Sequence, residues 1–142
     1  MVSNVRERIV AEAMAWVGTP YVHRGMMRGA GVDCATLLIC VYGNAGVIER
    51  FEPGYYSVEW HLHRREEEYL AHLDPYVEDT TSPKPGDLVL FRFGRTVAHS
   101  GIIVSDTSFV HAWKRSGVVI EQRWNQFWHE HVAKYVRPKG VD

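Results

Sequence analysis

The feature that most constrains the fold of this chain is residues 34–45, a stretch that is apolar on almost every side of a helix. A helix that is apolar all round has no face to show to water, so it is buried. Asp33 stands where an N-cap residue belongs, and Gly46 follows where the helix should end. A glycine-rich loop, residues 21–32, leads into it. The rest of the chain must therefore pack around this helix.

The order of the other expected elements places helices first and strands second. Residues 5–17 carry apolar side chains at helical spacing, with Ser3 or Asn4 as the cap, and a Gly-Thr-Pro sequence stops the helix. Strand-like runs separated by short turns follow at residues 88–93, 97–104, 108–113 and 118–123. Residues 124–136 add a last helical turn and a strand. The runs suit an antiparallel meander, so the sequence predicts an α+β fold in a single domain, residues 1–142.

Between these two halves lies a segment rich in aromatic residues, followed by a short helical pattern at residues 64–73. The aromatic residues of 51–60 are Phe51, Tyr55, Tyr56 and Trp60. These side chains could wall a cleft or bind a partner. The alternative is a small hydrophobic cluster beneath a long loop.

Charge and hydropathy exclude several classes of function. Sixteen basic residues against seventeen acidic ones give a formal charge of −1, so the chain lacks the basic excess that nucleic-acid binding needs. No apolar run approaches the roughly 20 residues of a membrane-spanning helix. Residues 1–15 lack the apolar core of a signal peptide, so we expect the chain to be cytoplasmic at synthesis. Neither nucleic acid nor membrane is an expected partner.

The two cysteines, Cys34 and Cys40, are expected to be free thiols. At their spacing on a helix they point about 240° apart, which a disulfide cannot bridge. A zinc site would need closer ligands, and His61 and His63 have no acidic or cysteine partner at ligand spacing. No metal and no other cofactor is predicted.

Cys34 is the main candidate for chemistry because it opens the buried helix directly after the glycine-rich loop. A helix N-terminus favours a thiolate and should lower the pKa of the thiol. The amides of the first turn, such as that of Ala35, have no partner within the helix and could bind an oxyanion. The alternative is a small core residue, which is the better interpretation of Cys40, deep in the helix. For Cys34 these arguments leave both interpretations open.

A general base for Cys34 would come from a histidine that the fold brings close. His99 and His111 lie on consecutive expected strands joined by a turn at residues 105–107, so their rings can share one face of a sheet. One imidazole would take the thiol proton and the other would fix its tautomer. Taken singly, each is as well explained as a core histidine with satisfied hydrogen bonds. The histidines with weaker claims are His23, His61, His63, His72, His129 and His131.

Five short blocks of the sequence, taken in order, resemble one known family. The blocks are Gly-Thr-Pro-Tyr at 18–21, Gly-Val-Asp-Cys at 31–34, Pro-Gly-Asp-Leu-Val-Leu-Phe at 85–91, Ala-His-Ser-Gly-Ile at 98–102 and Phe-Val-His-Ala at 109–112. They resemble the signature blocks of the NlpC family of papain-like cell-wall cysteine peptidases, with similar spacing. The resemblance implies a papain-like fold whose nucleophile starts a buried helix packed on an antiparallel sheet.

The resemblance also implies a role for each matching residue. Cys34 would be the nucleophile, His99 the base and His111 the polar residue that orients His99. Tyr21 matches a tyrosine that lines the site and supports the oxyanion. Asp33 matches an acidic neighbour of the nucleophile, although helix capping alone would explain it. The implied reaction is hydrolysis of an amide in peptidoglycan stem peptides, commonly next to D-glutamate, through a thioester.

The sequence departs from the family pattern in two places. Ala35 and Thr36 replace the Ser-Gly pair that usually follows the nucleophile, which bears on the substrate subsite. Residues 51–82 are longer and more aromatic than in compact secreted members, and this resembles phage-encoded members found with tail genes. The implied setting is a lysin of the virion tail, with phage tail proteins as partners. The alternatives are a structural tail-assembly protein with a weakly active or inactive peptidase fold, and an acyltransferase or amidase on the same fold.

Overall fold

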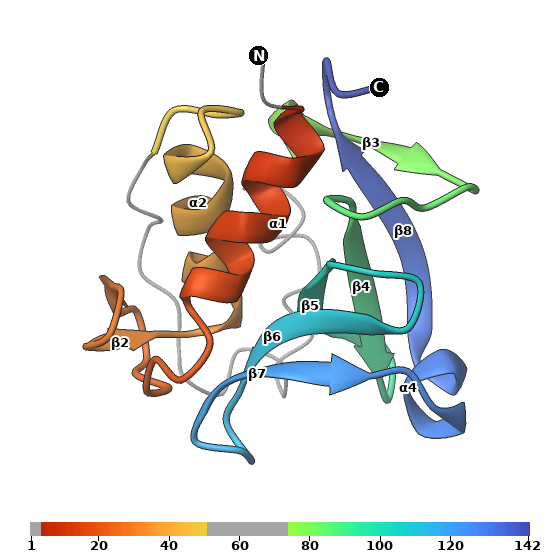
Figure 1. The fold of residues 1–142 in the computed structure, drawn as a ribbon. Coiled ribbons are helices and arrows are strands. Elements are labelled where there is room, and N and C mark those ends of the chain that lie inside the picture. Colours follow the sequence, from red (N-terminus) through yellow and green to blue (C-terminus); the bar gives the residue numbers. More distant parts are fainter. Residues whose placement is uncertain (1–3, 51–73) are drawn as a thin grey trace.

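A computed structural model describes residues 4–50 and 74–142 of the chain. Its longer helices, α1 (Val5–Ala15) and α2 (Cys34–Asn44), lie side by side on one face of an antiparallel sheet (Figure 1). The predicted α+β class is therefore confirmed. The expected aromatic segment and the expected helix after it lie outside the described residues.

The composition of the two helices explains their different exposure. α2 is apolar all round and is buried as predicted, with Leu37 and Cys40 wholly removed from solvent. α1 has a single apolar face, through which Ile9 and Ala13 join the same core. Asn4, one of the two predicted caps, starts α1 by accepting a hydrogen bond from a first-turn amide at 2.7 Å.

The main sheet has the strand order β3-β8-β4-β5-β6-β7, and every described pairing is antiparallel. The strands are β3 (Val77–Thr80), β4 (Leu88–Phe93), β5 (Thr96–Ile103), β6 (Ser108–Trp113), β7 (Val118–Arg123) and β8 (Val132–Pro138). The predicted meander is confirmed for β4 to β7. The chain then departs from it, because β8 returns to pair with the other edge of β4, and β3 pairs with β8.

Some strands have no counterpart in the sequence-based expectation. β3 is an edge strand whose side chains are half-buried or exposed, so it lacks the apolar alternation that marks a strand. The glycine-rich loop contains a hairpin of two very short strands, β1 (Met26–Met27) and β2 (Gly31–Val32). This hairpin gives the loop before α2 a defined shape.

The opposite face of the sheet is covered by aromatic side chains and a short helix. That helix, α4 (Gln126–Glu130), starts at Asn125, whose side chain accepts from the Trp128 amide at 3.0 Å. The ring of Trp128 is buried, 5.0 Å from the ring of Phe91 and 5.4 Å from that of Phe109. Edge-on aromatic pairs of this kind add stability beyond the area that they bury. The sheet is thus packed on both faces.

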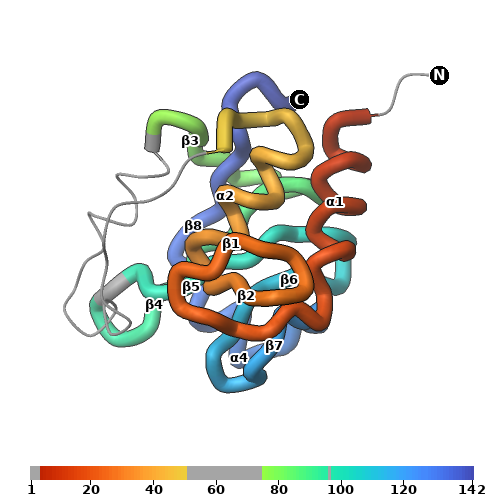
Figure 2. The backbone as a smooth tube through the Cα atoms, turned by 90° about the vertical axis from the view of Figure 1, so that its left-hand side faces the viewer, coloured from red at the N-terminus to blue at the C-terminus, as the bar shows by residue number. Residues whose placement is uncertain are grey.

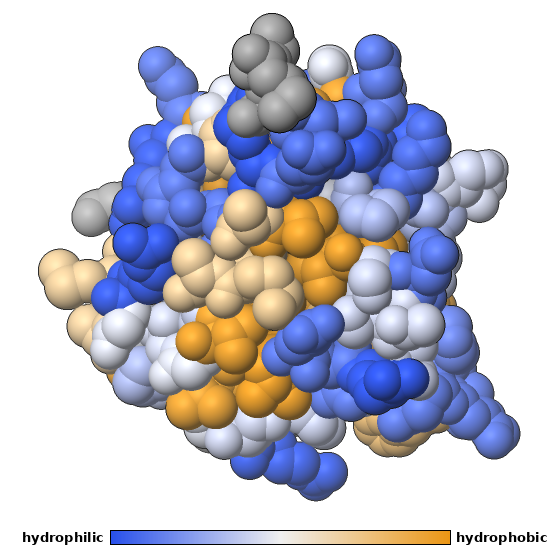
Figure 3. All heavy atoms as spheres, in the orientation of Figure 1, coloured by the Kyte–Doolittle hydropathy of each residue, from blue (hydrophilic) through white to orange (hydrophobic). Residues whose placement is uncertain are grey.

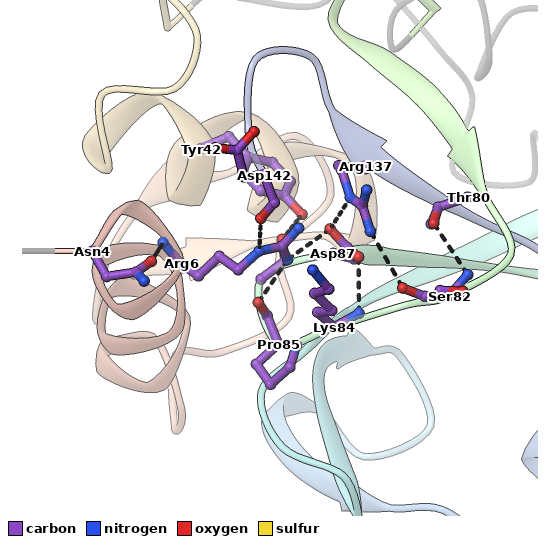
Figure 4. A network of polar contacts seen from close by, with 11 residues as sticks. Asn4, Arg6, Tyr42, Thr80, Ser82, Lys84, Pro85, Asp87, Arg137 and Asp142 are labelled. Carbon is purple, nitrogen blue, oxygen red and sulfur yellow. Dashed lines mark hydrogen bonds and ion pairs between the residues drawn. The ribbon is translucent and has the colours of Figure 1, made fainter.

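A buried ion cluster fastens the turn before β4 to two distant elements (Figure 4). Asp87 is wholly buried, and its Oδ1 lies 2.9 Å from Arg6 Nη1 and 3.5 Å from Arg137 Nε. Arg6 also donates to the carbonyl oxygen of Pro85 at 2.9 Å. Because Arg6 belongs to α1 and Arg137 to β8, the cluster ties both elements to this turn.

Apolar side chains gather across the middle of the face that α1 presents (Figure 3). Met14 and Val17 are 38% and 41% exposed. Val10 and Ala11 of α1, together with Val104, help to line a shallow groove. Within the described part of the chain, no helix is both long and apolar enough to cross a bilayer.

Candidate active site

The start of α2, the strands β5 and β6 and the turn after β6 border a cleft of about 590 Å³. α2 packs against both strands, which brings its first residue to the sheet (Figure 2). The cleft is lined by Tyr21, Cys34, Phe93, Ala98, His99, Ala112, Trp113, Lys114, Arg115, Phe127 and His131. Three of the predicted site residues, Tyr21, Cys34 and His99, therefore share one cleft.

A capping box holds Cys34 at the first position of α2. Asp33 Oδ1 accepts from the Ala35 amide at 3.0 Å and from the Thr36 amide at 2.9 Å. In return, Thr36 Oγ1 accepts from the Asp33 amide at 2.9 Å. Thr36, a departure from the family pattern, therefore closes the cap, and a cap of this kind contributes about 1 kcal/mol to stability.

The same cap corrects the predicted oxyanion role of Ala35. Its amide donates to Asp33 Oδ1, so it is not free in the way that the sequence predicts for the first turn of a helix. The cap makes no bond to the amide of Cys34. An oxyanion formed at Cys34 would therefore take its backbone donor from Cys34 itself.

Hydrogen bonds hold both ends of α2, one end to β5 and the other to the turn before β4. At the start, Ser100 Oγ of β5 donates to the carbonyl oxygen of Cys34 at 3.3 Å. Near the other end, the Tyr42 hydroxyl donates to the carbonyl oxygen of Gly86 at 2.9 Å. These bonds fix the helix, and with it the nucleophile, relative to β5.

The Cys34 thiol is not predisposed to ionise, contrary to the prediction from its helix position. Burial raises its pKa well above the ordinary value, and the charge of Asp33 raises it further. The Cys34 and Ala35 amides lower the pKa by a smaller amount. The helix N-terminus thus acts in the predicted direction, but desolvation outweighs it. Near neutral pH the thiol stays protonated and needs a base to become a nucleophile.

His99 and His111 form the pair that the sequence predicts. His99 Nε2 lies 2.6 Å from His111 Nδ1, and both rings are buried. Burial lowers the pKa of His111 to about 4. Burial also lowers the pKa of His99, and the neighbouring His111 lowers it further. Both imidazoles are therefore neutral near pH 7, and His99 keeps Nδ1 to act on a thiol.

A glycine beside this pair leaves room for an aromatic ring that supports it. β5 and β6 pair at Ile103 and Phe109. By strand alternation, His99, Gly101 and His111 share their face of the sheet. A Cβ at Gly101 would lie 2.6 Å from Phe109 Cδ2. The Phe109 ring fills this space and packs on His111, with ring centroids 4.9 Å apart, so Gly101 allows Phe109 to support the pair.

Tyr21 and Asp33, the other predicted site residues, differ in what they can do. Burial raises the pKa of Tyr21, and Cys34 and Asp33 raise it further, so its hydroxyl stays protonated. A protonated hydroxyl that lines the cleft can donate to an oxyanion. The Asp33 carboxylate has a structural role. Its Oδ1 caps α2, and its Oδ2 accepts a hydrogen bond from the Arg24 amide at 2.8 Å. Its carboxylate thus holds the loop before α2.

Several residues of the cleft are missed by the sequence argument. Lys114 and Arg115 follow closely after the His111 block, a position that could have drawn attention to them. Phe127 carries no local signal, and the sequence gives His131 only a weak claim. Their rings lie 4.5 Å apart, and their place depends on how α4 folds over the sheet. Among the described residues, no three potential metal ligands come together.

Iodoacetamide should alkylate Cys34 much faster than Cys40 near neutral pH. Cys34 lines the cleft together with a neutral imidazole that can take its proton, whereas Cys40 is wholly buried in the core and does not line the cleft. Peptide mass mapping after timed labelling gives both rates from one sample. His99→Ala should slow labelling of Cys34 and leave that of Cys40 unchanged. Equal rates at the two native thiols would contradict the assignment of the nucleophile.

Comparison with known proteins finds relatives that are named as endopeptidases. The murein DD-endopeptidase MepS/murein LD-carboxypeptidase of Escherichia coli strain K12 is 28% identical over 125 residues, which span 88% of this chain and 58% of that protein. A probable endopeptidase of Haemophilus influenzae is 30% identical over 133 residues, which span 88% of this chain and 73% of that protein. The chain thus spans little more than half of the Escherichia coli relative.

Solved structures confirm the predicted papain-like fold. A Staphylococcus aureus protein described as similar to lipoprotein, of the NLP/P60 family, superposes with a TM-score of 0.67 at 21% identity. The superposition covers 96% of this chain and 42% of that one. The NlpC/P60 family itself matches residues 18–137, a range that contains Cys34, His99 and His111. On this match the chain belongs to the NlpC/P60 family, as its sequence blocks predict.

Proposed function

We propose that this protein is a cysteine peptidase that hydrolyses an amide bond in the stem peptides of peptidoglycan. The observation that carries the proposal is a single cleft that holds Cys34 and His99, with His99 at 2.6 Å from His111. Relatives named as endopeptidases support the same reaction.

The geometry supports catalysis through a thioester. His99 Nδ1 takes the proton of the Cys34 thiol as Sγ attacks the carbonyl carbon of the scissile amide. The Cys34 amide and the Tyr21 hydroxyl donate to the resulting oxyanion. The His99 imidazolium then gives its proton to the leaving amine, and the acyl group stays on Sγ. Water deprotonated by His99 hydrolyses this thioester and restores the thiol.

The charge of the cleft supports an acidic substrate. Lys114 and Arg115 stand on its border, and its described lining contains no carboxylate side chain. Arg115 Cζ lies 5.7 Å from the centre of the Trp113 ring, a contact that keeps this cation beside the cleft. A glutamate linked through its γ-carboxyl keeps a free α-carboxylate that such cations can bind. We therefore infer that the scissile bond lies next to D-glutamate.

Muropeptides should be cleaved by the native protein and not by Cys34→Ala. Cys40→Ala is the matched control and should keep activity, because Cys40 lies in the core and outside the cleft lining. Mass spectrometry of the products locates the bond that is cut. Cleavage between the sugar and the first residue would identify an amidase, and transfer to an added amine an acyltransferase. If no muropeptide gives a product, the result would favour the alternative of a structural tail-assembly protein.

We further infer that the protein is made in the cytoplasm and acts at the bacterial cell wall from a phage or prophage tail, with tail proteins as partners. The support is the long, aromatic segment 51–82, which resembles that of phage-encoded members. Mass spectrometry of purified virions tests this setting. Absence of the protein from virions of a strain that expresses it would refute the setting and leave the peptidase function standing.

A further inference from the structure

One nitrogen of the His111 ring has no partner in the pair described above. His111 Nδ1 lies 2.6 Å from His99 Nε2. His111 Nε2 is buried and makes no hydrogen bond of normal geometry within the described residues. A buried polar atom left without a partner is destabilising, and such atoms are rare in native proteins. This nitrogen therefore marks a place where another polar group is expected to act.

Gln122 reaches toward this nitrogen from β7. His111 pairs with Ile120 and Phe109 pairs with Gln122, so Gln122 lies on the His111 face, one diagonal step along the strand. A long side chain can span such a diagonal. The Gln122 amide nitrogen donates to the Arg123 carbonyl oxygen at 3.2 Å, which leaves Oε1 to act as an acceptor.

The electrostatics agree with this placement. The Gln122 side chain raises the pKa of His111, against the larger lowering by burial. The contact is nevertheless not a well-aligned hydrogen bond in this structure. Catalytic hydrogen bonds are often long or misaligned in a free enzyme and tighten when substrate binds.

Among the described residues, the rings that contact His111 beyond His99 supply no hydrogen-bond acceptor. Its aromatic neighbours, at ring-centroid distances of 4.9, 5.6 and 5.0 Å, are Phe109, Trp113 and Trp128. The charged residues that flank Gln122 on β7, Glu121 and Arg123, alternate to the opposite face. Within the described structure, His99 is therefore the titratable group that faces His111. The side-chain amide of Gln122 is the polar group on the same face of the neighbouring strand.

We propose that Gln122 is a positioning residue that accepts a hydrogen bond from His111 Nε2–H and so fixes the tautomer of His111. This proposal rests on the proposed function, since it extends the same proton relay. With its proton on Nε2, His111 offers the lone pair of Nδ1 to His99 Nε2–H. His99 then keeps the lone pair of its own Nδ1 for the thiol. With the opposite tautomer of His111, His99 would hold its proton on Nδ1 and could not accept one from Cys34.

Gln122→Leu should lower kcat about 10- to 100-fold with little change in KM, by analogy with the loss found when the hydrogen-bond partner of a metal-binding histidine is removed. Arg123→Leu, the same replacement on the opposite face, is the matched control and should keep kcat. Gln122→Glu should keep turnover and move the acidic limb of kcat/KM to higher pH, because a carboxylate favours the protonated histidine pair.

The tautomer can be read without any activity, from ¹H–¹⁵N NMR spectra of the imidazole nitrogens. The native protein should carry the His111 proton on Nε2, and Gln122→Leu should show a mixture of tautomers. An unchanged tautomer in Gln122→Leu would overturn the proposal even in an active peptidase. A changed tautomer in a protein that cleaves no muropeptide would support the role of Gln122 and refute the peptidase function. If Gln122→Leu does not fold, the pH shift of Gln122→Glu decides.

Discussion

His99→Ala should abolish muropeptide turnover, with a loss of about 10² to 10⁴-fold or more. The pKa of the Cys34 thiol is raised, so the nucleophile depends on a base to ionise. His99 is neutral, lines the same cleft and is oriented by His111. Without it, the cleft loses the oriented imidazole that carries the thiol proton to the leaving amine. Initial rates of product release, measured by chromatography, give the loss directly.

His111 should tolerate substitution better than His99. His111→Asn and His111→Gln can still hydrogen-bond the His99 ring and should keep measurable activity. His111→Ala should lose more, because the His99 ring is then free to rotate and its tautomer is unfixed. His129→Ala is the matched control, since His129 stacks on Trp124 and does not line the cleft. A His99→Ala protein more active than His111→Asn would show that the two roles are reversed.

The largest loss of stability is expected from Asp87→Ala, at about 3 to 5 kcal/mol in the free energy of unfolding. Asp87 is wholly buried, and the side chains of Arg6 and Arg137 are only 12% and 21% exposed. Removing the carboxylate leaves two guanidinium groups near each other with little water to solvate them. Urea unfolding followed by circular dichroism measures the change.

Asp79→Ala is the matched control for this loss. Asp79 also pairs with a cation, 3.0 Å from Lys134 Nζ, but its side chain is 74% exposed and that of Lys134 is 39% exposed. Solvent screens such a pair, so losing it should cost less than about 1 kcal/mol. Similar small losses from the two substitutions would mean that the buried cluster is no stronger than the surface pair.

The parts of the fold that could be predicted are those with a strong local signal. α2 is apolar on every side, and β4 to β7 are apolar or alternating runs between clear turns. β3 has no such signal, because an edge strand with exposed side chains needs no apolar alternation. The position of β8 between β3 and β4 is set by pairing over long sequence distances, which no local pattern encodes.

In the candidate site, the residues could be predicted better than their electrostatics. The meeting of His99 and His111 follows from strand alternation across a short turn. The pKa of Cys34 depends on how much of the fold buries it, and the partner of the Ala35 amide depends on the conformation of Asp33. His131 enters the cleft through the fold of α4, so its position in the sequence carries no sign of it.

The bonds at both ends of α2 have a consequence for how this protein can diversify. Cys34 is anchored through Ser100 and Tyr42, whereas another border of the cleft is formed by the exposed turn at residues 114–117. Mutation can reverse the charges of Lys114 and Arg115 in that turn without removing either of these two bonds. Descendants of such a chain can therefore inherit the reaction intact while they exchange one substrate for another. Natural variation that changes substrate choice is expected to accumulate in this turn and to spare the helix.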